Sequence, residues 1–138
     1  YDNHHPDYNE PCEEAGGTQA MKEMVETIHG AGYLFGIHDQ YRDYYLRAPS
    51  FTWEKAVLLE DGTHPEHAFW AEGRQTYLCS DFALDYVKRN FDLLREKGIA
   101  LDAAYLDVFT CNEADECFHE DHTVSRKEGY ENRLACFD

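Results

Sequence analysis

The sequence predicts an α/β fold, and within that class a partial (β/α)8 barrel (TIM barrel) with parallel strands, flanking helices and one long aromatic-rich βα loop. Two helix-then-strand units, at about residues 18–39 and 80–109, repeat the order that builds a parallel sheet through right-handed crossovers. A closed barrel usually needs roughly 250 residues. The chain has 138 residues, so we expect residues 1–138 to form a single partial barrel domain, a fragment of a longer barrel.

The first unit ends in a histidine and an aspartate. Apolar side chains recur at the helical spacing i, i+3, i+4 and i+7 within residues 18–30, and the pattern stops at glycines. The predicted strand 33–39 follows directly. Because successive strand side chains point to opposite faces, Phe35 and Ile37 are expected to pack against helices. His38 is then expected to face the mouth of the barrel.

The second unit places a carboxylate at the end of its strand, where it is also expected to face the mouth of the barrel. A helix is predicted between Ser80, a favourable N-cap, and Gly98, a favourable stop. In the strand that follows, Leu106 and Val108 are expected to face the helices. The residues expected to face the barrel interior are Ala103, Tyr105, Asp107 and Phe109.

Barrel enzymes keep their chemistry at the carboxyl ends of the strands. If the two predicted strands are neighbours, they lie about 4.8 Å apart. His38 and Asp107 are then expected to face one bound ligand.

The insertion at residues 40–79 is longer than a usual βα loop and is rich in Tyr, Phe and Trp. Segments 56–60 and 75–79 predict a small β excursion within it. A third helix is predicted from residue 125, where Ser125 and Glu128 have the spacing of a capping box, and it is expected to continue past the last residue. The residues expected on its buried side are Tyr130, Leu134 and Phe137.

Charge excludes two classes of partner. The formal net charge is −16, with only 12 Lys and Arg residues, which argues against a nucleic acid or an anionic membrane surface. The five cysteines match no zinc-ribbon or CxxC redox pattern and do not fix the cellular compartment.

The chemistry that fits Asp107 is glycoside hydrolysis, in which two carboxylates flank the bond that is cut. Asp107 is the candidate nucleophile or stabilising carboxylate. No cofactor or metal is predicted for this reaction. Residues predicted to contact a carbohydrate substrate are His38, Asp39, Tyr41, Arg42 and Tyr105, while Trp70, Tyr41 and Tyr45 offer flat apolar faces for a sugar ring.

These residues resemble a known family. Segment 33–45, which reads YLFGIHDQYRDYY, and segment 104–109, which reads AYLDVF, are similar to the central part of glycoside-hydrolase-like (β/α)8 barrels. The resemblance implies a nucleophilic aspartate at the end of such a strand, and this carries over to Asp107 alone. It also implies an acid/base carboxylate on the following strand, beyond residue 138, so residues 1–138 alone are expected to be inactive.

A metal-dependent hydrolase is an alternative. Zinc is bound by Cys, His and Asp side chains, and release of protons on zinc addition or loss of folding on chelation would favour this reading. The candidate clusters are His4, His5 and Asp7; His64 and His67; and Cys111, Cys117, His119 and His122.

A further alternative is a non-catalytic barrel remnant that binds sugar. The discriminating feature is a second inward carboxylate, about 5–5.5 Å from Asp107 in a retaining enzyme or about 6.5–9.5 Å in an inverting one. The acidic residues nearest in sequence are Glu113, Asp115 and Glu116.

Overall fold

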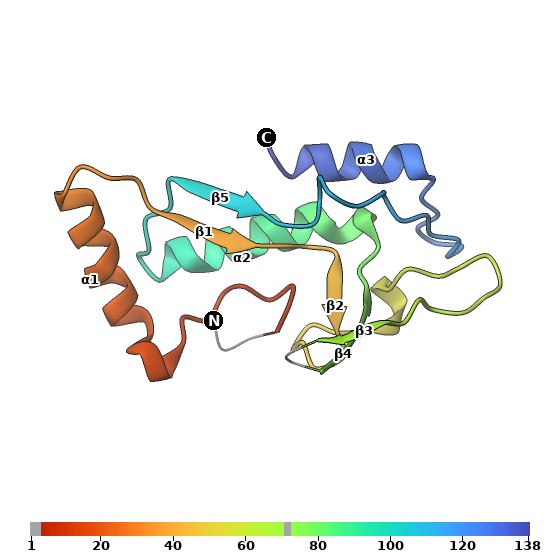
Figure 1. Ribbon diagram of the computed structural model, residues 1–138, viewed down its shortest axis with the longest axis horizontal. Helices are drawn as coiled ribbons and strands as arrows, with labels where there is room; N and C mark the ends of the chain where they lie inside the picture. The colour runs from red at the N-terminus through yellow and green to blue at the C-terminus, as the bar shows by residue number, and fades with distance from the viewer. Residues whose placement is uncertain (1–3, 71–72) are drawn as a thin grey trace.

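The computed structural model describes residues 4–70 and 73–138. Its centre is a pair of parallel strands, β1 (Gly36–Asp39) and β5 (Ala103–Leu106), which lie side by side in Figure 1. Their register places Gly36 opposite Ala103 and His38 opposite Tyr105. The prediction of a parallel sheet from the two helix-then-strand units is confirmed, and the structure makes the two strands direct neighbours.

Helices α1 (Gly17–Gly30) and α2 (Ala83–Glu96) precede these strands, as the sequence predicts. Ile37 of β1 is buried between them in a cluster with Val25, Leu94 and Ile99, and Phe35 packs against that cluster. One face of the parallel pair is therefore covered by helices, which leaves His38 on the opposite, exposed face.

The insertion forms an antiparallel sheet, in which the predicted segment 75–79 overlaps β4 (Gly73–Tyr77). Its order is β2 (Asp43–Tyr45), β4 (Gly73–Tyr77) and β3 (His67–Trp70). Segment 56–60 is not a strand and contributes only an isolated bridge between Ala56 and Leu78. Short 3-10 turns complete the connections: η1 (Glu13–Ala15), η2 (Trp53–Lys55) and η3 (Ser80–Phe82).

Helix α3 (Arg126–Ala135) begins at the predicted capping box, in which Ser125 and Glu128 bond each other's backbone amides. It ends at Ala135, within the chain, which corrects the expectation that it would continue past residue 138.

The predicted buried side of α3 is also wrong. Tyr130, Leu134 and Phe137 are 43%, 65% and 52% exposed. The helix instead buries Gly129 and Arg133. Arg133 donates to the carbonyls of Phe109, Asn112 and Glu113, so carbonyl oxygens of the preceding loop, not apolar side chains, hold this face.

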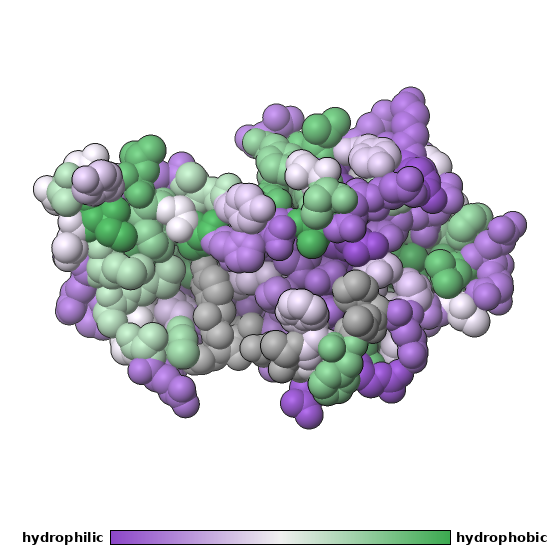
Figure 2. All heavy atoms as spheres, in the orientation of Figure 1, coloured by the Kyte–Doolittle hydropathy of each residue, from purple (hydrophilic) through white to green (hydrophobic). Residues whose placement is uncertain are grey.

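The apolar side chains of the insertion and those that follow β5 share one core. Its largest members include Tyr41, Tyr44, Tyr45, Tyr86, Leu106 and Phe109. On another side, hydrophobic residues gather over α1 and β1 (Figure 2). No helix among residues 4–70 and 73–138 is long and apolar enough to span a membrane.

Candidate active site

The parallel pairing brings His38 and Asp107 together. His38 Nε2 lies 3.6 Å from Asp107 Oδ2, and the two side chains are 62% and 41% exposed. Tyr105, directly opposite His38 in the strand register, packs its ring against the imidazole in a tilted arrangement, with ring centroids 5.2 Å apart. The carboxyl ends of β1 and β5 therefore present an imidazole, a carboxylate and a phenol on one solvent-facing surface.

The backbone around Asp107 is fixed by hydrogen bonds. Its amide donates to the Asp39 carbonyl at 2.8 Å, which continues the β1–β5 ladder one step past the strand. Its Oδ1 accepts the Val108 amide at 2.9 Å, so Oδ2 is the oxygen left to face His38. Val108 has φ 59°, a left-handed conformation that is unusual for a β-branched residue and is found at strained, often functional, positions.

This turn interrupts the strand alternation after Asp107. Phe109 is 4% exposed and packs in the core with Tyr41, so its predicted place on the open interior face is wrong. The physical reason is that β5 ends at Leu106 and Val108 has a left-handed backbone, so the period-two alternation of a strand no longer applies at Phe109.

Asp39 is a buried carboxyl, and Tyr41 is its partner. Asp39 is 0% exposed, and its Oδ2 accepts the Tyr41 hydroxyl at 2.5 Å. Burial raises the pKa of Asp39 to about 6, although the Tyr41 hydrogen bond acts in the opposite direction. Burial beside Asp39 also raises the pKa of Tyr41. Asp39 Oδ1 has no hydrogen-bond partner among the described residues.

Arg42, which follows β1, is engaged in a largely buried charged network. Its Nε and one Nη donate to the two oxygens of Asp115 at 2.7 and 2.9 Å, and its guanidinium stacks on Tyr77 at 3.7 Å. Arg133 also contacts Asp115, at 3.3 Å. The contacts of Tyr41 and Arg42 are thus structural ones, and their direct contact with substrate stays a prediction.

The acidic loop residues have other partners than Asp107. Asp115 is held by two arginines, while Glu113 and Glu116 both pair with Arg126. These contacts give the loop carboxylates structural roles.

An open apolar groove of about 540 Å³ lies between α1 and β1, and His38 is at its rim. Its walls are mostly apolar and include Met21, Met24, Phe35 and Ile37.

The structure regroups the predicted metal ligands. Cys117 and His122 lie together, but their third neighbour is Cys79, from the segment before α2, while Cys111 is exposed. The hydrogen bond from Cys79 lowers the pKa of Cys117 to about 5, and the same bond raises the pKa of Cys79. The sequence offered no signal for Cys79, because it lies far from the other two along the chain.

The remaining predicted metal clusters have ordinary contacts. His5 Nδ1 bonds Gln40, Asp7 pairs with Arg89, and His64 Nδ1 bonds the Val57 carbonyl at 2.7 Å. The His67 side chain lies outside the described part of the structure.

The family model of glycoside hydrolase family 101, described as endo-alpha-N-acetylgalactosaminidase, matches residues 1–130. The chain belongs to this family. The resemblance to glycoside hydrolases inferred from segments 33–45 and 104–109 is thereby confirmed.

Solved structures similar to this member of the endo-alpha-N-acetylgalactosaminidase family include alpha-N-acetylgalactosaminidase NagBb from Bifidobacterium bifidum. Its complexes with GalNAc and with Gal-NHAc-DNJ each match with 58% sequence identity and a TM-score of 0.94. The ligand-free form also matches with 58% identity and a TM-score of 0.94. The match to the GalNAc complex covers 99% of this chain but spans only 22% of the length of NagBb. No curated protein matched the chain in a sequence search.

Proposed function

We propose that this chain forms part of the catalytic domain of a glycoside hydrolase that cleaves α-linked N-acetylgalactosamine, with Asp107 as nucleophile or stabilising carboxylate. The observation that carries the proposal is the parallel pairing of β1 with β5, which presents Asp107 and His38 at one strand end with 3.6 Å between Nε2 and Oδ2. Family membership and the titles of the similar structures, which name GalNAc-type ligands, supply the substrate class.

Asp107 has the exposure that this role needs. A nucleophile must reach the anomeric carbon, and Asp107 has one carboxylate oxygen held by the Val108 amide and one directed to the open face. The hydrogen bond to a backbone amide fixes the side-chain rotamer, so the attacking oxygen is preorganised.

Around this carboxylate, exposure divides the predicted substrate contacts into two groups. We assign direct sugar contacts to His38 and Tyr105, because both are exposed beside Asp107. The other three predicted contacts are buried or paired, and we propose that they stabilise the strand end that carries His38; these are Asp39, Tyr41 and Arg42.

A sugar needs an apolar platform as well as hydrogen-bonding groups. Of the three aromatic residues predicted for stacking, Tyr41 and Tyr45 are each 1% exposed, whereas Trp70 is 65% exposed. Trp70 is therefore the candidate platform.

We also propose that β1 and β5 belong to a (β/α)8 barrel, with residues 1–138 as one part of it. Each strand pairs on one edge only within the described residues, and such free edges are removed when a barrel closes. The apolar groove beside β1 and the exposed apolar side of α3 would be covered by further βα units.

The acid/base carboxylate is proposed to lie beyond residue 138. Glu113, Asp115 and Glu116 are held in ion pairs with arginines, which favours structural roles for them. Residues 1–138 on their own are accordingly expected to lack activity.

The test is hydrolysis of p-nitrophenyl N-acetyl-α-galactosaminide by the natural protein at its full encoded length, as wild type and as Asp107→Asn. We expect the variant to lose about 10³-fold or more in kcat, within the range for loss of a catalytic group, and to keep its fold by circular dichroism. The matched control is Asp92→Asn, on the exposed side of α2.

Full activity in Asp107→Asn would refute the catalytic assignment. A wild-type protein that binds GalNAc but does not hydrolyse the glycoside would favour the non-catalytic sugar-binding alternative.

A further inference from the structure

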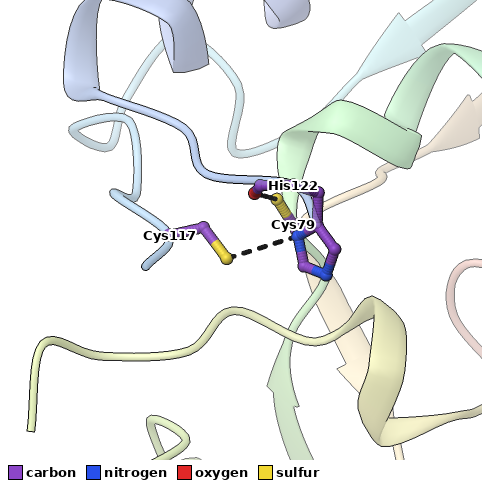
Figure 3. A group of neighbouring side chains, drawn as sticks. All are labelled: Cys79, Cys117 and His122. Atoms are coloured by element: carbon purple, nitrogen blue, oxygen red, sulfur yellow. Dashed lines mark hydrogen bonds between the residues drawn. The ribbon is translucent and has the colours of Figure 1, made fainter. Parts of the chain in front are cut away.

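Three metal-ligating side chains converge away from the strand ends. Cys79, Cys117 and His122 are 0%, 1% and 7% exposed, and their ligand atoms all lie within 4.8 Å of one another. Figure 3 shows the Cys117 sulfur directed at the imidazole of His122, and the Cys79 sulfur beside the His122 backbone carbonyl, to which its thiol donates at 3.8 Å. Two thiols and an imidazole in one buried space are the donor set of zinc sites.

The imidazole of His122 is oriented as in a metal ligand. Its Nε2 lies 2.8 Å from the Glu54 carbonyl oxygen, which can only accept, so Nε2 carries the proton. In the neutral imidazole Nδ1 is then the unprotonated nitrogen, and it lies 3.5 Å from Cys117 Sγ. A histidine that donates one ring N–H to a backbone carbonyl while the other nitrogen faces the cluster is the usual arrangement around a bound metal.

The Cys117 sulfur also has support of its own. It accepts the Leu58 backbone amide at 3.4 Å, and Cys117 forms a two-way backbone bridge with Val124. Backbone amides directed at a sulfur favour the thiolate form, which is the form that binds metal. His122 and Cys117 are thus held by neighbouring backbone groups before any metal arrives, and the Cys79 thiol contacts the backbone carbonyl of His122 itself.

We propose that Cys79, Cys117 and His122 bind a thiophilic divalent cation, zinc by preference, at a structural site. Two thiolates and one imidazole give three ligands of a tetrahedral ion. Structural zinc sites usually have a fourth protein ligand, and here a water molecule would take that position. The burial of all three side chains makes this a site for fixing the chain and not one for attacking a substrate.

The three ligands come from two segments that lie about forty residues apart in the chain and meet in one buried cluster with Val57 and Val124. Cys79 precedes α2, Cys117 and His122 lie on the loop after β5, and the insertion supplies Glu54 and Leu58 as supporting groups. A bound ion would therefore clamp the insertion to that loop, whose Asp115 in turn holds Arg42 beside β1. The proposal stands independently of the reaction at Asp107.

Cobalt(II) is the probe, because thiolate ligands give it an intense near-ultraviolet charge-transfer band that carboxylates and imidazoles alone do not give. The reduced natural protein at its full encoded length is stripped of metal and titrated with cobalt(II), and then with zinc(II) as competitor. We expect stoichiometric binding with this band in the wild type, and displacement of the band by zinc.

The variants Cys79→Ser and Cys117→Ser are expected to weaken cobalt binding by about 100-fold or more, since even changes outside the ligand shell cost 10- to 100-fold. Cys111→Ser is the matched control. Cys111 belongs to the metal cluster predicted from sequence spacing. In the structure it is exposed and is not part of the cluster of Cys79, Cys117 and His122, so this variant should bind cobalt as the wild type does.

The wild-type titration decides the matter even if the Cys79 or Cys117 variants fail to fold. Absence of a thiolate-to-cobalt band in the folded, reduced wild type would overturn the proposal. Equal loss of binding in Cys111→Ser would overturn the ligand assignment, as would a Cys79–Cys117 disulfide, found by peptide mapping, whose reduction leaves a protein that binds no cobalt.

Discussion

Arg42 and Asp115 form a bidentate ion pair that ties the segment after β1 to the loop after β5, with N–O distances of 2.7 and 2.9 Å. Their side chains are only 12% and 18% exposed. The pair holds together the two chain segments whose ends form the candidate active site.

We expect Asp115→Ala to destabilise the protein by about 2–4 kcal/mol, because it leaves Arg42 and Arg133 partly buried without a counter-charge. Arg42→Lys should cost less, about 1–2 kcal/mol, since it keeps the charge but loses the bidentate bond and the stacking on Tyr77. Urea unfolding of the natural protein measures both.

The control for this pair is the exposed one between Arg95 and Asp92, whose side chains are 76% and 60% exposed. Arg95→Ala should change the free energy of unfolding by about 0.5 kcal/mol or less. A loss of similar size in Arg95→Ala and Asp115→Ala would contradict the importance given to burial.

Asp39→Asn should stabilise the protein at pH 8. Burial raises the pKa of Asp39 to about 6, whereas an unfolded aspartate titrates near 3.9. Between these values the folded state holds a proton that the unfolded state has lost, so the wild type loses stability as pH rises through about 4 to 6 and does not regain it above. The amide variant removes this cost and keeps an oxygen for the Tyr41 hydroxyl.

The expected gain for Asp39→Asn is about 2–3 kcal/mol at pH 8, and it should vanish near pH 4. Denaturant unfolding at pH 4, 6 and 8 measures it. The surface variant Asp92→Asn should show no such pH-dependent difference. A gain in Asp39→Asn that is constant from pH 4 to 8 would mean that the carboxylate's charge is not its origin.

Ser125→Ala should destabilise α3 by about 1 kcal/mol, because it removes both the hydroxyl that accepts the Glu128 amide and the capping box. Thermal unfolding monitored by circular dichroism measures the effect. Lys127→Ala, in the same first turn but 85% exposed, is the control and should be nearly neutral.

Trp70→Ala should raise the KM for an α-GalNAc glycoside by about 10-fold, which corresponds to about 1.4 kcal/mol of lost binding. The reason is that Trp70 is the exposed member of the aromatic residues predicted to stack on sugar. Trp53→Ala is the matched control, because Trp53 is half exposed but packs on Phe51 and His64. An unchanged KM in Trp70→Ala would remove the residue from the site.

The sequence was enough to predict the elements that rest on local patterns. The helical spacing before residue 30, the capping box at Ser125, and the two strands, which end at Asp39 and at Leu106, all follow from interactions between residues close in the chain. Period-two alternation also predicted that Ile37 faces the helices and that His38 does not.

Local sequence patterns gave wrong predictions of burial where contacts with residues distant in the chain determine which side chains are buried. The apolar residues of α3 predicted the wrong face, because Arg133 is buried by carbonyls of a loop some twenty residues earlier. Alternation predicted the wrong side for Phe109, because the positive φ of Val108 breaks the strand geometry.

By itself, then, the sequence determined the α/β class, the two helix-then-strand units and the aspartate at the end of the second one. Only the tertiary structure decided that Asp107 lies beside His38, that Arg42 is committed to Asp115, and that Cys79 joins Cys117 and His122. The physical reason is that helix and strand patterns act over a few residues, whereas ion pairs and ligand clusters form between segments whose proximity arises only when the core packs.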